Sequence, residues 1–205
     1  MNPLRLGCLA SHGGTNLQAI IDACKSGALD AEVRVVISNN SSSTALGRAR
    51  NEGIPGYHLS GVTHPGPEEL ARAIHETLKS HDVDIVMLVG YMKKLGRAVL
   101  DGYPVRILNT HPALLPGFGG KGMYGQRVHE AVLEAGDRVT GVTVHLVDAE
   151  YDRGPIVAQC EVPVLDGDSV ETLSVRVLEQ EHAFLVETLG MISRGEIDLD
   201  ALGTS

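Results

Sequence analysis

The stretch Arg106–Pro116 reads RILNTHPALLP, and the interpretation of the whole chain starts from it. It begins with the apolar residues Ile107 and Leu108, which are typical of a buried strand, and then presents an amide, a hydroxyl and an imidazole in succession. These belong to Asn109, Thr110 and His111, and a proline then ends the extended segment. Because Asn and His before a proline are also common turn residues, two interpretations stay open: a strand that ends in a reactive centre, or an ordinary turn.

The strand expected just upstream, Asp84–Tyr91 (DIVMLVGY), favours the first interpretation. It is apolar enough to be buried on both faces, as a central strand of a parallel sheet is. In open α/β sheets, ligands bind outside the carboxyl ends of such strands, and Asn109 and His111 would lie there. We therefore expect a functional site at this end of the sheet.

Strand-like and helix-like segments alternate along the chain, which predicts an α/β fold with a doubly wound, mostly parallel sheet. The expected strands are 4–10, 32–38, 57–59, 84–91 and 106–110, and the expected helices are 17–25, a short one ending at 51, 67–80 and 127–135. Two more strand-like runs, 139–147 and 155–164, are joined by a short acidic loop and predict an antiparallel extension at one sheet edge. A long C-terminal helix over 170–193, capped by Asp168 or Ser169, completes the fold.

Length and composition limit the classes of function. A chain of 205 residues suits one domain, 1–205, and its net charge of -9 disfavours nucleic-acid binding, so the expected partners are small molecules. Cys8, Cys24 and Cys160 show no metal or disulfide spacing, and we expect reduced, buried thiols. Neither a leader nor a membrane-spanning run is recognisable, which predicts a soluble, cytoplasmic protein; a homodimer through a sheet edge is compatible with the sequence.

The loop Ser11–Asn16 (SHGGTN) lies between the first expected strand and the first expected helix. Glycines let a ligand approach the backbone, and the free N–H groups of a helix start attract phosphate, with Thr15 or Asn16 as the helix cap. The loop matches neither the P-loop motif nor the dinucleotide motif. A phosphate site and a plain capping turn both remain as interpretations.

A second glycine-rich segment, Gly117–Gly125 (GFGGKGMYG), contains G-x-G-x-x-G by letter. It follows a proline-flanked loop, and the next helical pattern starts only near Gln126, so we reject it as a nucleotide motif. A mobile lid beside the site and a simple connector are the two remaining interpretations.

The polar groups of the expected site suit acyl transfer. Asn109 and a protonated His111 can donate hydrogen bonds to an oxyanion, and Asp152 could keep His111 protonated near neutral pH if the two side chains lie close together. Alone, Asp152 would read as a loop carboxylate in water. No metal-ligand spacing and no nucleophile motif is present, so direct transfer between two bound substrates is the simplest chemistry.

Together these segments resemble the folate-dependent glycinamide ribonucleotide (GAR) formyltransferases of purine biosynthesis. The likeness runs over about residues 4–190, and the element N-x-H-P-x-L-L-P with the later D-x-G-P is specific to formyl-transferring domains. The matching pieces are SHGGTNLQAIIDA (11–23), VVISNN (35–40), VGYMKKL (89–95), ILNTHPALLP (107–116), GVTVHLVDAEYDRGPIVAQ (141–159) and EQEHAF (179–184).

The resemblance implies a Rossmann-like formyltransferase fold and a role for each matching residue. The catalytic residues would be Asn109, His111 and Asp152. The GAR-binding residues would be Gly14, Thr15, Asn16 and Glu181, with Glu181 at the glycinamide end. The folate-binding residues would be Met92, Lys93, Lys94, Leu95, Asn109, Val147, Asp148 and Glu150. Without the family, Glu181 is a carboxylate in an apolar helix segment that either calls for a partner or lies at the surface.

The resemblance further implies 10-formyltetrahydrofolate as co-substrate, no metal, and transfer of its formyl group to the GAR amine, giving formyl-GAR and tetrahydrofolate. A formyltetrahydrofolate hydrolase, which usually carries an additional N-terminal domain, and a non-catalytic sugar-phosphate binding module are the alternatives. The chain departs from the family pattern at a folate-site arginine, at a polar phosphate contact and at a second folate-site arginine. Pro67 stands at the first arginine, Leu178 at the phosphate contact and Lys93 at the second arginine.

Overall fold

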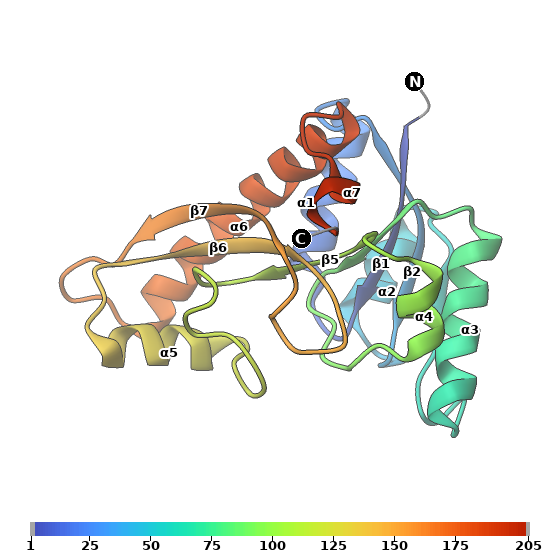
Figure 1. The fold of residues 1–205 in the computed structure, drawn as a ribbon, viewed down its shortest axis with the longest axis horizontal. Coiled ribbons are helices and arrows are strands. Elements are labelled where there is room, and N and C mark those ends of the chain that lie inside the picture. The colour runs from blue at the N-terminus through green and yellow to red at the C-terminus, as the bar shows by residue number, and fades with distance from the viewer. Residues whose placement is uncertain (1–2, 204–205) are drawn as a thin grey trace.

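The chain forms the expected alternation of strands and helices, and Figure 1 shows the computed structural model, which describes residues 3–203 of the expected domain 1–205; residues 1–2 and 204–205 lie outside the described part. The strands are β1 (Leu4–Ala10), β2 (Ala31–Ser38), β3 (Gly56–His58), β4 (Ile85–Leu88), β5 (Ile107–His111), β6 (Val139–Leu146) and β7 (Ile156–Pro163). The helices are α1 (Thr15–Ser26), α2 (Thr44–Asn51), α3 (Pro67–Ser80), α4 (Arg97–Gly102), α5 (Gln126–Ala135), α6 (Val170–Ser193) and α7 (Leu199–Leu202).

The strands build one seven-stranded sheet in the order β3-β2-β1-β4-β5-β6-β7. The pairs from β3 to β5 are parallel, and β6 and β7 add to the β5 edge in antiparallel fashion, which confirms the expected architecture. Leu88, the last residue of β4, pairs with Asn109, so Thr110 and His111 extend beyond the end of β4. Thr110 and His111 therefore have no paired residue in β4, and the end of β5 is open on the β4 side.

Helices cover both faces of the sheet (Figure 1). One core contains apolar residues of α1, α2, α5, α6 and α7, and the other contains those of α3 and α4. Leu108 belongs to the first core and Ile107 to the second, because successive side chains of a strand point to opposite faces. Along β5, Thr110 thus faces α6, while Asn109 and His111 face the opposite side.

Two differences from the sequence prediction have a clear cause in the packing, while the ends of other elements move by one or two residues. The central strand β4 is shorter than the expected Asp84–Tyr91, because Gly90 at φ +78° turns the chain and the Asp84 carboxylate pairs with Arg5 at 2.6 Å. Helix α1 is capped by Gly14 in a left-handed conformation and not by Thr15 or Asn16. A glycine is needed there because a Cβ on Gly14 would lie 2.8 Å from the Ala45 Cβ of α2.

The long helix α6 begins as expected at Ser169, whose hydroxyl accepts from the Thr172 N–H in a capping box. Asp168 is held by a bidentate pair with Arg176, at 2.6 and 2.8 Å. This fixes the start of α6 against the end of β7, where the Pro163 carbonyl also accepts from Arg176. Within residues 3–203, no helix combines the length and the apolar character that crossing a bilayer requires.

Candidate active site

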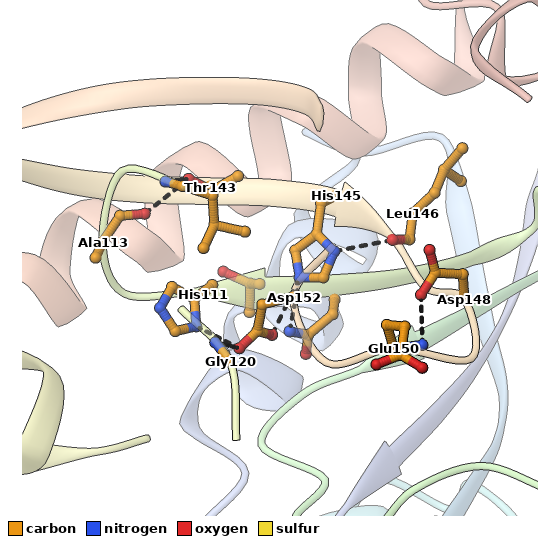
Figure 2. Close-up of polar contacts among 12 residues, drawn as sticks. His111, Ala113, Gly120, Thr143, His145, Leu146, Asp148, Glu150 and Asp152 are labelled. Atoms are coloured by element: carbon orange, nitrogen blue, oxygen red, sulfur yellow. Dashed lines mark hydrogen bonds and ion pairs between the residues drawn. The ribbon is translucent and has the colours of Figure 1, made fainter. Parts of the chain in front are cut away.

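His111 and Asp152 lie side by side, largely shielded from solvent, so the condition set for their interaction is met (Figure 2). The His111 Nδ1 atom is 3.7 Å from Asp152 Oδ2, and the two side chains are only 4% and 12% exposed. His111 comes from the end of β5, and Asp152 comes from the loop between β6 and β7 at a left-handed φ of 54°. The interpretation of Asp152 as a carboxylate in open water is therefore wrong.

A second histidine, His145 of β6, joins this pair. His145 lies opposite Asn109 in the antiparallel ladder, and cross-strand partners share a face of the sheet. Its Nε2 atom is 3.1 Å from Asn109 Nδ2 and 3.6 Å from Asp152 Oδ1, and its Nδ1 atom is 2.8 Å from the Leu146 carbonyl. Asp152 is thus flanked by an imidazole on each oxygen, and His145 connects it to Asn109.

The loop 117–125 contacts the pair through its backbone. The Phe118 carbonyl oxygen is 2.8 Å from His111 Nε2, and the Gly120 N–H donates to Asp152 Oδ2 at 2.9 Å. Figure 2 shows Gly120 beneath the Asp152 carboxylate. Neither contact depends on a particular side chain of the loop.

Burial governs the charge of this cluster. It lowers the pKa of His111 below its ordinary value, although the Asp152 charge and the Phe118 carbonyl act in the opposite direction. Asp152 thus raises the pKa of His111 in the expected direction, but burial outweighs it and the net shift is opposite to the expected one. Burial alone would raise the pKa of Asp152, but the contacts with His145 and the Gly120 N–H, together with the histidine charges, bring it below its ordinary value. Asp152 is ionised and His111 is mainly neutral at pH 7.

The segment after His111 is fixed by Thr143 of β6. The Thr143 hydroxyl donates to the Ala113 carbonyl at 2.7 Å and accepts from the Leu115 N–H at 3.0 Å. Gln159 of β7 donates to the same hydroxyl at 2.8 Å and to the Leu115 carbonyl at 2.9 Å. Thr143 is fully buried and lies opposite His111 in the ladder, so the antiparallel extension holds the chain that leaves the site.

Glu181 lies on the other face of β5 and is buried, with 7% of its surface exposed. Its Oε1 atom accepts from Thr110 Oγ1 at 2.9 Å and from Asn16 Nδ2 at 3.0 Å. Burial raises the pKa of Glu181 despite these hydrogen bonds, and no Lys, Arg or His among residues 3–203 forms an ion pair with it. The Asn16 Oδ1 atom beside it is buried without a protein partner. The surface interpretation of Glu181 is wrong, and these oxygens are suited to a donor group on a ligand.

The loop 11–16 is positioned by contacts from three directions. Ser11 accepts from the Met92 N–H at 2.8 Å and donates to Asn39 at 2.6 Å, which ties the ends of β1, β2 and β4 together. Arg48 of α2 donates to the Gly13 carbonyl at 2.9 Å and brings a cation to the loop. Thr15 is exposed, whereas Asn16 points inward to Glu181.

The two segments expected to bind folate lie close to each other. Lys94 Nζ lies 5.4 Å from the centre of the Tyr151 ring, so the segment after β4 contacts the loop that carries Asp152. Met92, Lys93, Lys94, Asp148 and Glu150 are exposed, Val147 is half-buried, and Leu95 is buried. The Asp148 carboxylate accepts from the Glu150 N–H at 2.7 Å and shapes the loop. Pro67 begins α3, whose Ala71 packs against Gly96 directly after the first of these segments.

Comparison with known proteins identifies the family. The family model for formyl transferases matches residues 4–189 of this chain. The chain belongs to the formyl transferase family.

Individual relatives agree with this assignment. This formyl transferase is 39% identical over 194 residues to the chloroplastic phosphoribosylglycinamide formyltransferase of Arabidopsis thaliana, and the match covers 94% of the chain but only 66% of the plant protein. It is 37% identical to the phosphoribosylglycinamide formyltransferase of Escherichia coli over 93% of the chain and 88% of that protein. The crystal structure of glycinamide ribonucleotide transformylase 1 from Symbiobacterium toebii superimposes with a TM-score of 0.88 at 41% identity and covers 95% of the chain and 89% of its own.

Sequence reasoning did not find several residues around the site of this formyl transferase. His145 and Thr143 alternate with the apolar residues of β6, so they share the polar face of a buried strand, and that pattern was a usable signal. The contacts of Phe118 and Gly120 are made by backbone atoms, and the glycines that permit them were interpreted from the sequence as a lid or a connector. The cysteines are free as expected, but Cys24 and Cys160 are only half-buried.

Proposed function

We propose that this chain transfers the formyl group of 10-formyltetrahydrofolate to the amine of glycinamide ribonucleotide, as a cytoplasmic step of purine biosynthesis. The observation that carries the proposal is the buried cluster of Asn109, His111 and Asp152, linked through the next residue of β5, Thr110, to a buried carboxylate on α6. One side of β5 thus offers proton-transfer groups, and the other offers acceptors for an amine or hydroxyl. Membership of the formyl transferase family supports the reaction class.

The proposed chemistry needs no net proton uptake by the protein. The GAR amine attacks the formyl carbon, a C–N bond forms, and the carbonyl oxygen becomes an oxyanion to which Asn109 donates a hydrogen bond. The neutral ring of His111 takes the proton that leaves the attacking nitrogen, and ionised Asp152 stabilises the resulting imidazolium. The bond to the folate nitrogen then breaks, and His111 gives the proton to that nitrogen. The lowered pKa of His111 suits this order of steps, because the ring must start as a base.

The proposed GAR site comprises Gly14, Thr15 and Asn16 for the phosphate end and Glu181 for the glycinamide end. The phosphate would meet backbone N–H groups at the start of α1, and the positive end of the helix dipole favours an anion there. Arg48 donates a hydrogen bond to the Gly13 carbonyl and adds a positive charge near this loop. Leu178, which stands at the family's polar phosphate contact, offers no such charge.

The proposed folate site comprises the segment Met92–Leu95, which is exposed except for Leu95, and the loop from Val147 to Asp152. Support comes from the contact between Lys94 and Tyr151, which brings these segments together, and from Asn109, which pairs with Leu88 of β4 and contacts His145 of β6, the strands that precede the two segments. Backbone groups of the two segments are available to read the edge of a pterin ring.

The experiment that tests the proposed function follows folate deformylation by absorbance, with and without GAR. We expect release of tetrahydrofolate only when GAR is present. Release without GAR would mean hydrolysis, and no release in either case would leave a binding module; both results contradict the proposal. In the same assay His111→Ala should lower kcat by about 10²–10⁴-fold, the usual contribution of acid–base catalysis, with substrate binding largely retained.

A further inference from the structure

The segment Phe118–Gly120 contacts both members of the His111–Asp152 pair, and both contacts come from its backbone. A carbonyl oxygen can only accept a hydrogen bond, so the contact between His111 Nε2 and the Phe118 oxygen requires a proton on Nε2. A neutral His111 then carries its lone pair on Nδ1, the atom that faces Asp152 Oδ2 at 3.7 Å. The other nitrogen, Nε2, already donates its hydrogen bond to the Phe118 carbonyl.

We propose that Phe118–Gly120 is a positioning segment that fixes the tautomer of His111 and the orientation of Asp152, and that Nδ1 is the nitrogen of His111 that exchanges protons with the substrates. The Phe118 carbonyl anchors Nε2, and the Gly120 N–H turns Asp152 Oδ2 toward Nδ1. The reaction to which this applies is the proposed formyl transfer, but the tautomer itself is a property of the free protein.

The amino acids of this segment fit such a role. A Cβ on Gly119 would lie 2.5 Å from Leu115 Cδ2 and 3.3 Å from Asp152 Cβ, so any other residue would require Leu115 and Asp152 to shift, and glycine allows the close approach without this. Gly120 has φ +99°, which orients its N–H toward Asp152 in a conformation that other residues rarely adopt. The glycines of this loop are therefore used for contact as well as for the turn.

The neighbouring histidine provides an internal reference. The Nδ1 atom of His145 is 2.8 Å from the Leu146 carbonyl, so His145 carries its proton on Nδ1, and its Nε2 accepts from Asn109. The two imidazoles that flank Asp152 are thus assigned opposite tautomers. Asp152 and His145 both act on the charge of His111, and the pKa of His129, which is buried on α5, is lowered by burial and in turn by the His111 charge.

The first measurement is a long-range ¹H–¹⁵N spectrum of the ¹⁵N-labelled full chain, without ligand, at a pH where both rings are neutral. Single His→Gln variants assign the two signals. We expect the pattern of an Nε2–H ring for His111 and of an Nδ1–H ring for His145. An Nδ1–H ring at His111 overturns the proposal, whether or not the protein transfers formyl groups.

The second measurement compares Gly120→Ala with Gly122→Ala. Both glycines lie in the same loop at similar φ values, +99° and +94°, and neither has an atom within 4 Å of an added Cβ, so the backbone strain is matched. Only Gly120 donates to Asp152. We expect Gly120→Ala to lower kcat by about 10–100-fold with KM values changed much less, because misplacement of catalytic groups acts on the chemical step. Gly122→Ala should stay close to wild type.

Gly119→Ala gives an independent check, since its Cβ would crowd both Leu115 Cδ2 and Asp152 Cβ and so disturb the contact of the segment with Asp152. Its spectrum should show a mixture of His111 tautomers, whereas Gly122→Ala should keep the single Nε2–H form. Equal kcat losses in Gly120→Ala and Gly122→Ala, or an unchanged tautomer in a folded Gly119→Ala protein, would assign the segment a structural role only. Absence of formyl transfer by the wild-type chain would refute the proposed function but leave the spectra to decide the tautomer.

Discussion

The replacement Asp152→Asn tests the electrostatic part of the mechanism, because it removes a charge with little change in shape. Asp152 Oδ2 lies 3.7 Å from His111 Nδ1. At an effective dielectric constant of about 20, two unit charges at this separation attract by about 4 kcal/mol. This energy is available only when His111 is protonated, which in the proposed mechanism happens during the reaction and not before it.

The expected effect is a loss in kcat of about 10²–10³-fold, since 4 kcal/mol corresponds to about three orders of magnitude and the asparagine carbonyl still accepts a hydrogen bond. The pH–rate profile should change as well. Activity requires neutral His111 and falls as pH drops through its pKa. The Asp152 charge raises that pKa, so its removal should move the acidic limb to lower pH.

The assay is steady-state formyl transfer from pH 5 to 9 with both substrates varied. Asp84→Asn is a suitable control, because Asp84 also pairs with a cation, Arg5 at 2.6 Å, at a place remote from the site. It should leave kcat unchanged. An Asp152→Asn enzyme with wild-type kcat, or with an acidic limb displaced to higher pH, would show that the Asp152 charge does not stabilise protonated His111 during the reaction.

Three further predictions follow from buried polar groups. Glu181→Gln should increase stability by about 0.5–2 kcal/mol in urea unfolding while raising KM for GAR, because Glu181 is buried without an ion-pair partner among residues 3–203; a loss of stability would contradict this account. Thr143→Val should cost about 1–3 kcal/mol by leaving the Leu115 N–H unpaired, whereas Thr77→Val, which loses one bond within α3, should cost less in the same experiment. Stability should also decrease as pH falls below about 6.5, since burial lowers the pKa of several histidines and the unfolded chain then binds more protons than the folded one; a flat profile would argue against it. These histidines are His111, His129 and His182. Replacing His129 by Gln should reduce the slope of this pH dependence measured by thermal unfolding.

Much of the fold was predictable because the hydrophobic pattern determines it locally. The apolar strands and the helical stripe of α3 follow from spacing, and the polar face of β6 follows from alternation. The position of His111 after a buried strand, together with Asn109, was enough to indicate a site. Asp152 could be joined to them only as one hypothesis among others, because a loop carboxylate has no local signature.

The rest depends on contacts between distant segments. The direction of the His111 pKa shift is set by how completely the loops bury the ring, and residue types near His111 do not encode this. Gly14 caps α1 in place of Thr15 or Asn16 because α2 packs against it, and the Asn16 side chain donates a hydrogen bond to Glu181 instead. The positioning segment Phe118–Gly120 contacts His111 and Asp152 through main-chain atoms, so no side chain in the sequence identifies these contacts.

The central claim is direct transfer of a formyl group between two substrates bound at His111 and Asp152. The most direct test is a single turnover with excess enzyme, a donor labelled with ¹³C in its formyl group, and GAR, followed by mass spectrometry of the protein and the small molecules. We expect all transferred label to appear in formyl-GAR and none on the protein or as formate. Label as formate, or as a formyl adduct of the chain, would contradict the central claim.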